Sequence, residues 1–526
     1  MRRNAPFLSN LDLNSYSVFT LIAMLLVTVA TARGQDLASF EKRTTVKKLP
    51  NGLTVIVCER HEAPVFSFYT IVDVGSSDDP MGESGLAHMF EHMAFKGTDK
   101  IGTKNYAKEK IALEKVEQAY AAYDREDRRE IGRDPKKLEQ LRTAFEQAVK
   151  EADQYVVRNQ FGEIIEQEGG VGLNAATSMD DTVYYYSMPV NRLELWAYLE
   201  SERFRHPVMR EFYKERDVVY EERRMRVDSN PIGRMVEQFL AAAYVAHPYQ
   251  RSGVGWPFDV SHLTATEAME FYKKYYVPSN TVIAVVGDLK PAQVFPILEK
   301  YFGAIPSASK AEPLVTVEPK QFDERRVTLR ESTQPLYLEG YHRPSYLDPD
   351  DAVYDVISDL LSEGRTSRLY RSLVRDKKIA AVAAGFSGFP GNKFPNLFAF
   401  YAVPTQGHTT AEVEKAFREE IERIKTQDVS EEELQMVKTR AKAALIRGLA
   451  DNEGLASQLA INQTRYGDWR ELFRSVDRIE RVTKADTRRV ANKTFIESNR
   501  TVASIENVPG KPSPAAQGTE NPQEKK

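Results

Sequence analysis

The alternation of apolar and polar positions along the chain predicts a series of strands and helices. Two apolar runs flank a Pro-Asn-Gly turn at residues 45–58, which is typical of a β-hairpin, and residues 65–74 form another bulky, β-branched run. From residue 84 apolar positions recur every three or four residues, which predicts a helix. Strand character returns at 169–188 after a glycine-rich turn, and 191–226 is again predicted to be helical.

A buried strand at residues 280–287, followed by a helix ending near Phe302, closes this first series. The rest of the chain repeats the order of elements with little residue identity. Its predicted elements are strands at 326–340, a helix at 352–374, a strand at 397–403, helices at 430–450 and 485–495, and a strand at 501–506. We therefore expect an α+β protein built from two similar α/β-sandwich domains.

Shifts in composition predict where these domains begin and end. The first domain is expected at residues 35–306 and the second at 323–508, with a linker rich in Pro and Lys at 307–322. Residues 509–526 contain almost no apolar side chain and are predicted to be disordered.

Residues 105–153 interrupt the first domain with a stretch dense in Glu, Lys, Arg and Ala. Apolar residues occur there at helical spacing, and a Gly-Arg-Asp-Pro break at 132–135 predicts an antiparallel helical hairpin inserted into the domain. Two interpretations remain open: a solvated protrusion without chemistry, or an arm that docks a partner.

Overall composition excludes several classes of protein. The chain has 526 residues, of which 42% are hydrophobic and 28% charged, and its formal net charge is only −4. No bulk positive field is available to bind nucleic acid, so no nucleic-acid partner is expected. The single cysteine, Cys58, excludes an intramolecular disulfide framework. No glycine-rich phosphate-binding motif is present.

The N-terminus indicates export. A strongly apolar stretch of thirteen residues at 18–30 follows Arg2 and Arg3 and runs into a small-x-small pattern, whereas a membrane span needs about 20 residues. This is typical of a secretory signal peptide at 1–34, so we expect a periplasmic or secreted protein with no membrane span in the mature chain. A retained anchor and a mitochondrial address are the alternatives.

The pentapeptide His88-Met-Phe-Glu91-His92 carries the most chemical information. Residues i and i+4 share a face of a helix, so both imidazoles can reach one metal ion, and Glu91 borders that face. Two imidazoles and a carboxylate suit Zn²⁺, and a fourth position open to water is typical of a catalytic site. The alternative is a pair of histidines on a partly buried helix.

A third ligand is expected from the acidic helix at residues 214–228. Glu215 and Glu222 are seven residues apart and therefore lie on one face, whereas Glu221 points about 100° away. A metal ligand with a second carboxylate behind it matches the usual layered construction of metal sites. The alternative is a solvated acidic helix balanced by its own arginines.

Several motifs together resemble the pitrilysin/insulinase family of zinc metallopeptidases (peptidase family M16), in its short, bacterial and mitochondrial-processing-peptidase-like branch. The resemblance extends over residues 40–507. The motifs that carry it are the inverted zinc motif at 88–92, GLNAATSMDDTVYYY at 172–186, KERDVVYEERRMR at 214–226, HPYQRSGVGWPFDV at 247–260 and FYKKYYVPSNTVIAVVGD at 271–288.

This resemblance implies a role for each site residue and a fold for the whole. It implies one zinc ion per chain, a general base that activates water at the zinc, and two domains forming half of a clamshell that encloses unfolded peptides. The implied zinc ligands are His88, His92 and Glu222, the general base is Glu91, the supporting acid is Glu215, and the edge-strand residues that bind substrate are Asn174 and Ala175.

One position departs from the family pattern. Family members carry an Arg and, seven residues later, a Tyr that bind the substrate carbonyl from the opposite half; here Arg375 fits but Val382 replaces the Tyr. Valine cannot donate that hydrogen bond. We therefore expect a heterodimer with a related subunit lacking the zinc motif, unless another donor compensates in a homodimer. A non-catalytic or slow-turnover peptide-binding or assembly subunit is the alternative function.

Overall fold

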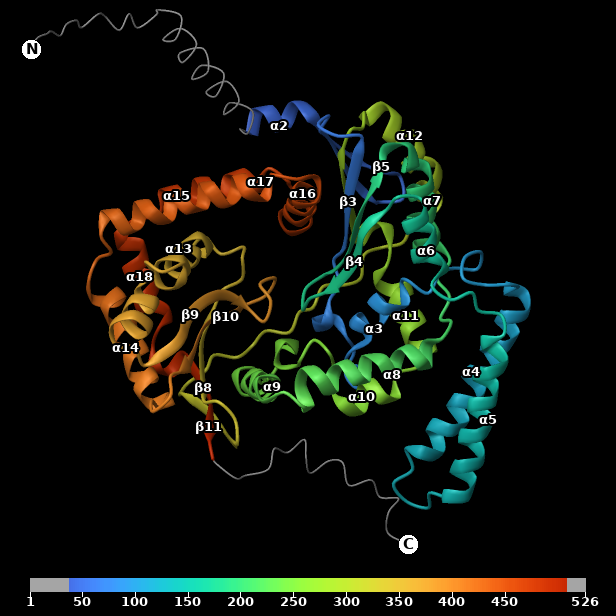
Figure 1. Ribbon diagram of the computed structural model, residues 1–526, viewed down its shortest axis with the longest axis horizontal. Helices are drawn as coiled ribbons and strands as arrows, with labels where there is room; N and C mark the ends of the chain where they lie inside the picture. The colour runs from blue at the N-terminus through green and yellow to red at the C-terminus, as the bar shows by residue number, and fades with distance from the viewer. Residues whose placement is uncertain (1–36, 509–526) are drawn as a thin grey trace, which may run out of the picture.

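The computed structural model describes residues 37–508, so the predicted signal peptide and C-terminal tail lie outside the described residues. The described chain forms two halves, here called the first half (residues 37–306) and the second half (residues 323–508), each built on one sheet with helices (Figure 1). Within residues 37–508, every helix is too short or too polar to cross a membrane.

The first half contains a six-stranded sheet in the order β1-β2-β6-β3-β5-β4. β2 and β6 run parallel, and all other neighbours run antiparallel. Its strands are β1 (Thr44–Lys48), β2 (Thr54–Glu59), β3 (Val65–Val72), β4 (Val171–Thr177), β5 (Thr182–Pro189) and β6 (Thr281–Gly287). Within residues 37–508, this order leaves β4 at one edge, where its outer backbone groups have no partner strand.

The second half contains a five-stranded sheet in the order β7-β11-β8-β10-β9, in which only β7 and β11 are parallel. Its strands are β7 (Arg325–Glu331), β8 (Leu336–Arg343), β9 (Ala380–Phe389), β10 (Asn396–Pro404) and β11 (Arg500–Asn507). Without β1, the first sheet has the same strand order and the same directions. The expectation of two similar α+β domains is therefore confirmed.

Helices surround both sheets. Those of the first half are α2 (Leu37–Arg43), α3 (Leu86–Met93), α4 (Tyr106–Asp127), α5 (Pro135–Asp153), α6 (Gln160–Gln167), α7 (Leu193–Arg205), α8 (Phe212–Arg223), α9 (Pro231–Ala243), α10 (Pro257–His262), α11 (Ala265–Tyr275) and α12 (Pro291–Tyr301). Those of the second half are α13 (Asp351–Ser362), α14 (Thr410–Thr426), α15 (Glu431–Gly448), α16 (Asn452–Tyr466), α17 (Glu471–Arg481) and α18 (Lys484–Thr494).

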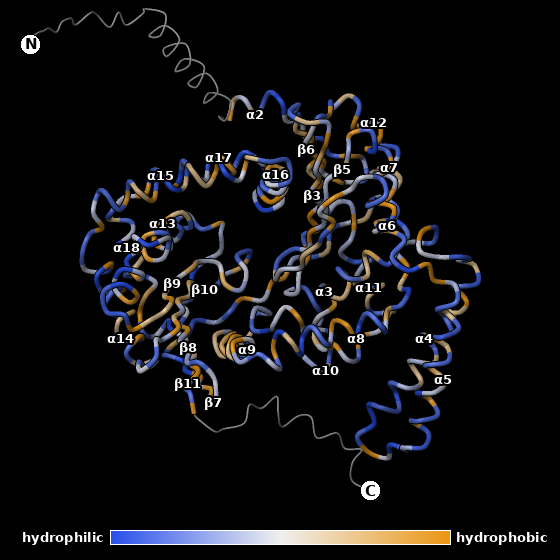
Figure 2. The backbone as a smooth tube through the Cα atoms, viewed as in Figure 1, coloured by the Kyte–Doolittle hydropathy of each residue, from blue (hydrophilic) through white to orange (hydrophobic). Residues whose placement is uncertain are grey.

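One helix of each half packs against the sheet of the other half. α16 packs against β3 and β6 of the first sheet, where Leu455 and Leu459 are fully buried, and α9 packs against β7 and β11 of the second sheet through Met235 and Phe239. Figure 2 shows hydrophobic positions gathered along the strands and on α9, the surfaces that meet. The domain limits expected from sequence therefore do not delimit independent cores.

The inserted hairpin forms as predicted, with α4 and α5 joined by a turn through Gly132. Its inner part is not a free protrusion. Tyr120 and Phe145 pack against Tyr213 at the start of α8, and the Arg216 guanidinium lies over the Tyr120 and Tyr213 rings. The hairpin is thus anchored on α8, and its tip extends away from the body (Figure 1).

Two predicted helices differ from the structure, and one strand was not predicted. The helix expected at 191–226 breaks between α7 and α8, where Glu211 adopts a left-handed backbone conformation with φ 58°. The helix expected at 352–374 ends at Ser362, and a separate π-helix, η8 (Tyr370–Asp376), follows. β9 was not predicted because its Ala- and Gly-rich sequence has little strand propensity; pairing with β10 recruits it.

Candidate metal centre

The helix that carries the two histidines begins at a tightly defined point. Gly85 precedes α3 with φ 98°, a conformation that favours glycine, and the buried Asp79 carboxylate accepts hydrogen bonds from the Gly85 and Ala87 amides at 2.7 and 2.8 Å. Asp79 lies outside the helix and has no motif of its own, so it was missed from the sequence. It fixes where the helix starts and therefore which way the histidines face.

His88 and His92 lie one turn apart on α3, and their ring centroids are 4.9 Å apart and perpendicular. α8 packs against α3 and brings Glu222 to them: His88 Nε2 lies 3.5 Å from Glu222 Oε2, and His92 Nε2 lies 3.7 Å from Glu222 Oε1. The ligand atoms of the three residues all lie within 4.8 Å of one another. The structure thus brings together the three ligands expected from the sequence.

These three side chains fit a zinc ion. A tetrahedral site with bonds of about 2.0–2.2 Å places neighbouring ligand atoms about 3.3–3.6 Å apart, close to the two distances seen here. Burial lowers the pKa of His88 to about 3, so the imidazole is neutral and its lone pair is available. Glu222 Oε2 is buried and accepts no hydrogen bond within the described chain, although the Arg226 guanidinium lies 3.2 Å away.

A second carboxylate orients one of the histidines. His92 Nδ1 lies 3.0 Å from Glu215 Oε1, which leaves Nε2 directed at Glu222, the usual support for a metal-binding imidazole. Lys96 reaches the other oxygen of Glu215 at 2.5 Å. Burial alone would raise the pKa of Glu215, but the hydrogen bonds from His92 and Lys96 outweigh it and lower this pKa to about 2. Lys96 was not identified from the sequence.

Glu91 lies on the same helix, between the two histidines. Burial raises its pKa above the ordinary value for a glutamate, and the nearby Glu222 carboxylate contributes in the same direction. A carboxylate whose pKa is raised toward neutrality is a better proton acceptor. Glu221, by contrast, is exposed and forms an ion pair with Arg224 at 2.8 Å. The alternative interpretation of the helix at 214–228 as a solvated acidic helix therefore holds only for this pair.

The edge strand β4 runs beside α3. Asn174 pairs in register with Tyr185 and Ala175 with Tyr184 on the inner side, and the opposite side of β4 has no neighbouring strand. The Asn174 side chain accepts a hydrogen bond from the Ala175 amide at 2.9 Å and donates one to the Tyr185 hydroxyl at 3.0 Å. The two predicted substrate-binding residues thus lie on an edge adjacent to the metal group.

Comparisons with known proteins agree with this geometry. The family model described as "Insulinase (Peptidase family M16)" matches residues 54–127 and 147–255, and the model "Peptidase M16 inactive domain" matches residues 262–441. The chain belongs to peptidase family M16. Residues 128–146, at the tip of the inserted hairpin, fall in the gap between the two matched segments.

Relatives of this M16 protein are similar over most of their length. It is 28% identical over 500 residues to the zinc protease PqqE of Helicobacter pylori, covering 92% of this chain and 97% of the relative. It is 24% identical over 479 residues to a probable mitochondrial-processing peptidase subunit beta of Arabidopsis thaliana, covering 88% of this chain and 78% of the relative.

Solved structures share the fold. The crystal structure of a protease from Helicobacter pylori matches with a TM-score of 0.73 at 26% identity, covering 88% of this chain and 99% of that one. The periplasmic protease PqqL from Escherichia coli matches with a TM-score of 0.65 at 18% identity, and the match covers 91% of this chain but 49% of PqqL.

Arg375 and Val382 lie in the second half of this M16 protein. Arg375 lies in the last turn of the π-helix η8, is exposed, and pairs with the neighbouring Asp376 at 2.7 Å. Val382 lies on β9, the edge strand of the second sheet, opposite Val403. Among residues 37–508, neither side chain contacts the three metal-ligating residues. The structure therefore does not assemble a substrate-carbonyl donor at the metal group from these two positions.

A buried arginine braces the helices of the metal group and was missed from the sequence. Arg223, next to Glu222, is only 2% exposed and donates to both carboxylate oxygens of Glu237 on α9, at 2.8 and 3.2 Å, and to the Gly255 carbonyl. Gly255 in turn lies against Ser84, just before α3. The brace therefore joins α8, α9 and the start of α3.

Proposed function

We propose that this chain is a zinc-dependent endopeptidase that hydrolyses unstructured peptides. The observation that carries the proposal is the convergence of His88, His92 and Glu222 at zinc-ligand spacing, with Glu91 on the same helix. The relatives named zinc proteases support it.

Each protein group then has a distinct task. A Zn²⁺ ion held by the three ligands would polarise a substrate carbonyl and acidify a water molecule. The Glu91 carboxylate takes up the proton of the attacking water and returns it to the leaving amine. Glu215 holds the His92 imidazole in the tautomer whose Nε2 faces the metal position.

The substrate is proposed to bind as an added strand. The free edge of β4 offers backbone donors and acceptors beside α3, and pairing through the main chain tolerates many sequences. Such pairing requires an extended peptide, which excludes a folded segment from the same position. Asn174 and Ala175 are the β4 residues proposed to lie opposite the substrate.

A second chain is proposed to complete the enzyme. The match to PqqL covers about half of that protein, as expected if one PqqL chain contains two units of this size. Val382 supplies no hydrogen-bond donor, so we favour a heterodimer with a related subunit that lacks the zinc motif and contributes an Arg/Tyr pair. A homodimer requires another donor. Export is also proposed, with a mature chain that starts near residue 35.

The proposal is tested by incubating the mature chain with a quenched, unstructured peptide, with Glu91→Gln as the control and zinc content measured on both samples. We expect one zinc ion per chain in both samples, and chelator-sensitive cleavage by the wild type but not by Glu91→Gln once a related subunit supplies the missing donor. Cleavage by this chain alone would contradict the need for a second subunit. Absence of zinc from the wild type would overturn the peptidase proposal.

The absent donor at Val382 favours one other function, a peptide-binding or assembly subunit with slow turnover. That function predicts full zinc occupancy and peptide binding without cleavage, even when candidate partner subunits are added. Restored cleavage on adding a related subunit would exclude it.

A further inference from the structure

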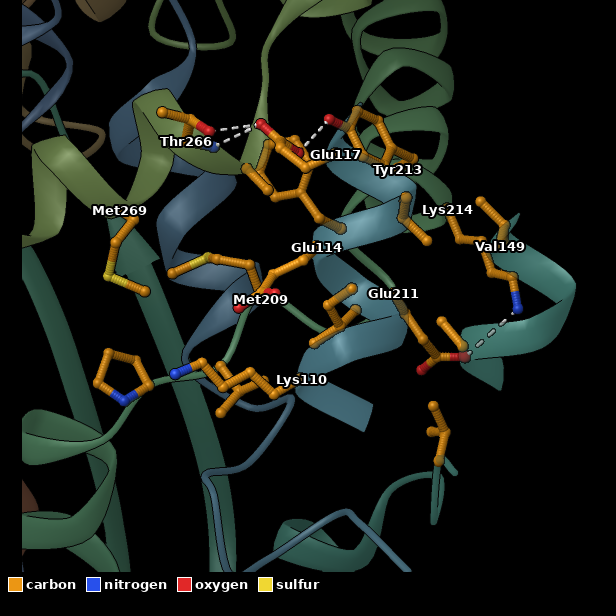
Figure 3. Close-up of a pocket in the computed structure, with 18 of the residues that line it drawn as sticks. Lys110, Glu114, Glu117, Val149, Met209, Glu211, Tyr213, Lys214, Thr266 and Met269 are labelled. Carbon is orange, nitrogen blue, oxygen red and sulfur yellow. Dashed lines mark hydrogen bonds and ion pairs between the residues drawn. The ribbon is translucent and has the colours of Figure 1, made fainter. Parts of the chain in front are cut away.

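A cavity of about 430 Å³ lies between the inserted hairpin and the body of the first half (Figure 3). It is lined by α4 and α5 on one side and by α11, the start of α8 and the loop before α8 on the other. Its volume is within the range of roughly 300–1,000 Å³ typical of small-molecule sites. Because one wall is the hairpin, the cavity exists only through the insertion.

The interior of the cavity is largely apolar, and Glu117 and Lys214, two of its polar residues, are already paired. Glu117 accepts hydrogen bonds from the Tyr213 hydroxyl at 2.6 Å and from the Thr266 amide at 3.1 Å, and Lys214 pairs with Asp153. The apolar lining includes Leu113, Val116, Val149, Met209, Phe212 and Met269. An apolar body can therefore enter without leaving a buried polar group unsatisfied.

The mouth of the cavity carries free charges of both signs. α4 contributes Lys110 and Glu114, and α11 contributes Glu270 and Lys273; all four side chains are exposed. Within residues 37–508, none of the four side chains has a hydrogen bond or an ion pair. The rim can therefore bind one ammonium group and one carboxylate at the same time, which neither a simple lipid nor a simple amine offers.

We propose that this cavity binds a short apolar peptide with free ends, of two or three residues. The apolar side chains occupy the methionine-lined interior, Glu114 or Glu270 binds the terminal ammonium group, and Lys110 or Lys273 binds the terminal carboxylate. That the zwitterion is a peptide rests on the proposed peptidase function, since such peptides are the class of product that an endopeptidase releases.

The cavity is connected to the metal group through charged side chains. Glu211 lines the cavity and lies 3.8 Å from Lys96, which also binds Glu215, the carboxylate behind His92. A ligand that moves the Glu211 carboxylate leaves the Lys96 ammonium group with Glu215 as its remaining carboxylate partner. The strength of the ion pair between Lys96 and Glu215 then changes. Occupancy of the cavity is therefore expected to alter zinc affinity, by about twofold to fivefold.

Binding is measured by calorimetry on the Glu91→Gln chain, which retains the cavity but does not hydrolyse. The probe is the dipeptide Phe-Leu, compared with N-acetyl-Phe-Leu-amide. We expect measurable binding of the free dipeptide and at least about tenfold weaker binding of the blocked form. Equal binding of both forms, or no binding of the free dipeptide at millimolar concentration, would overturn the proposal.

Two matched pairs of variants locate the site. Val149→Trp fills the cavity and is expected to weaken binding about tenfold or more, whereas Ile111→Trp, on the same hairpin but outside the lining, leaves it unchanged. The double variant Lys110→Ala/Lys273→Ala is expected to weaken binding about twofold to fivefold, as an exposed ion pair implies, whereas Lys274→Ala, outside the lining, leaves it unchanged. Equal effects on dipeptide binding within either pair would contradict the location of the site in this cavity. If Val149→Trp does not fold, the lysine variants alone test that location.

A separate readout distinguishes this proposal from the peptidase proposal. Zinc affinity is measured by chelator competition with and without Phe-Leu, and dipeptide binding is repeated on zinc-free protein. Binding to zinc-free protein that is abolished by Val149→Trp supports the cavity even if the wild type cleaves nothing. Binding that requires zinc would instead place the dipeptide at the metal group and overturn the proposal.

Discussion

The two halves of this M16 protein share strand order, apart from β1, and helix order, yet within residues 37–508 only the first half has a group of side chains that could ligate a metal. In the first half, the helix after the second shared strand (α3) and the second helix after the fourth (α8) bring two histidines and a glutamate together. In the second half, the corresponding helices α13 and α15 are joined by an ion pair, Asp359 with Arg440 at 2.6 Å. The same scaffold thus holds either a metal group or a structural ion pair, and a few side chains decide which.

The largest difference in peptide cleavage is expected between two variants that each lose one carboxylate, one on a helix of the first half and one on a helix of the second half. Glu222→Gln removes a zinc ligand, and cleavage should fall about 10³-fold or more because several kcal/mol of transition-state stabilisation depend on the metal. Asp359→Asn, on α13 of the second half, should change cleavage by less than about threefold. Zinc content and peptide cleavage are measured on both variants; a bound metal in Glu222→Gln would contradict the ligand assignment.

The exchanged helices predict that the two halves do not unfold separately. Phe239→Ala on α9 and Leu459→Ala on α16 each delete a fully buried side chain and should lower the free energy of unfolding by about 2–5 kcal/mol. Both variants should retain a single transition, followed by fluorescence and circular dichroism during urea unfolding. The half-exposed Ile446→Ala on α15 is the control and should have little effect. Two separated transitions would show that the halves are independent.

A smaller effect is expected behind the metal ligands. Glu215→Gln removes the charge that orients His92, so zinc affinity should fall about 10- to 100-fold while the fold is retained. Glu221→Gln is the matched control, because Glu221 lies on the same helix but pairs only with the exposed Arg224. Chelator competition measures both affinities, and equal values for the two variants would remove Glu215 from the site.

The smallest expected effect concerns a buried carboxylate of the second half. Burial raises the pKa of Glu339 to about 7, despite its hydrogen bond from Tyr337 and the nearby Arg500. The folded state keeps this proton between about pH 4.5 and pH 7, where the unfolded chain releases it, so the free energy of unfolding falls as the pH rises.

Glutamine does not titrate, so the free energy of unfolding of Glu339→Gln should fall less between pH 5 and pH 7.5 than that of the wild type. The difference between the two decreases should be about 1–2 kcal/mol. Urea unfolding at pH 5 and pH 7.5 measures the difference, with the exposed Glu506→Gln as control. An identical pH dependence in the wild type and in Glu339→Gln would show that Glu339 ionises normally in the folded protein.

Much of the candidate site could be predicted because it depends on local spacing. The i, i+4 separation of His88 and His92 and the seven-residue separation of Glu215 and Glu222 place each pair on one helix face whatever the rest of the chain does. The repeated order of strands and helices likewise follows from periodicity. The roles of Asn174, Ala175 and Arg375 came from the resemblance and stay predictions.

Contacts between distant segments could not be predicted in this way. Asp79, Lys96 and Arg223 carry no motif, and they act only because folding brings them to α3, Glu215 and Glu237. β9 is a strand because β10 lies beside it. The insertion was predicted as a helical hairpin, but its packing on α8 and the cavity beneath it depend on surfaces more than fifty residues apart.

The sequence by itself determined the helix faces, the family and the repeated architecture, because these depend on periodicity and on residue type within a few turns. Tertiary structure decided that Glu222 lies beside the histidines while Glu221 faces solvent. It also decided that one helix of each half packs on the sheet of the other half, and that an ion pair joins α13 and α15 in the second half. Those outcomes depend on burial and on which distant surfaces meet, quantities that no local pattern contains.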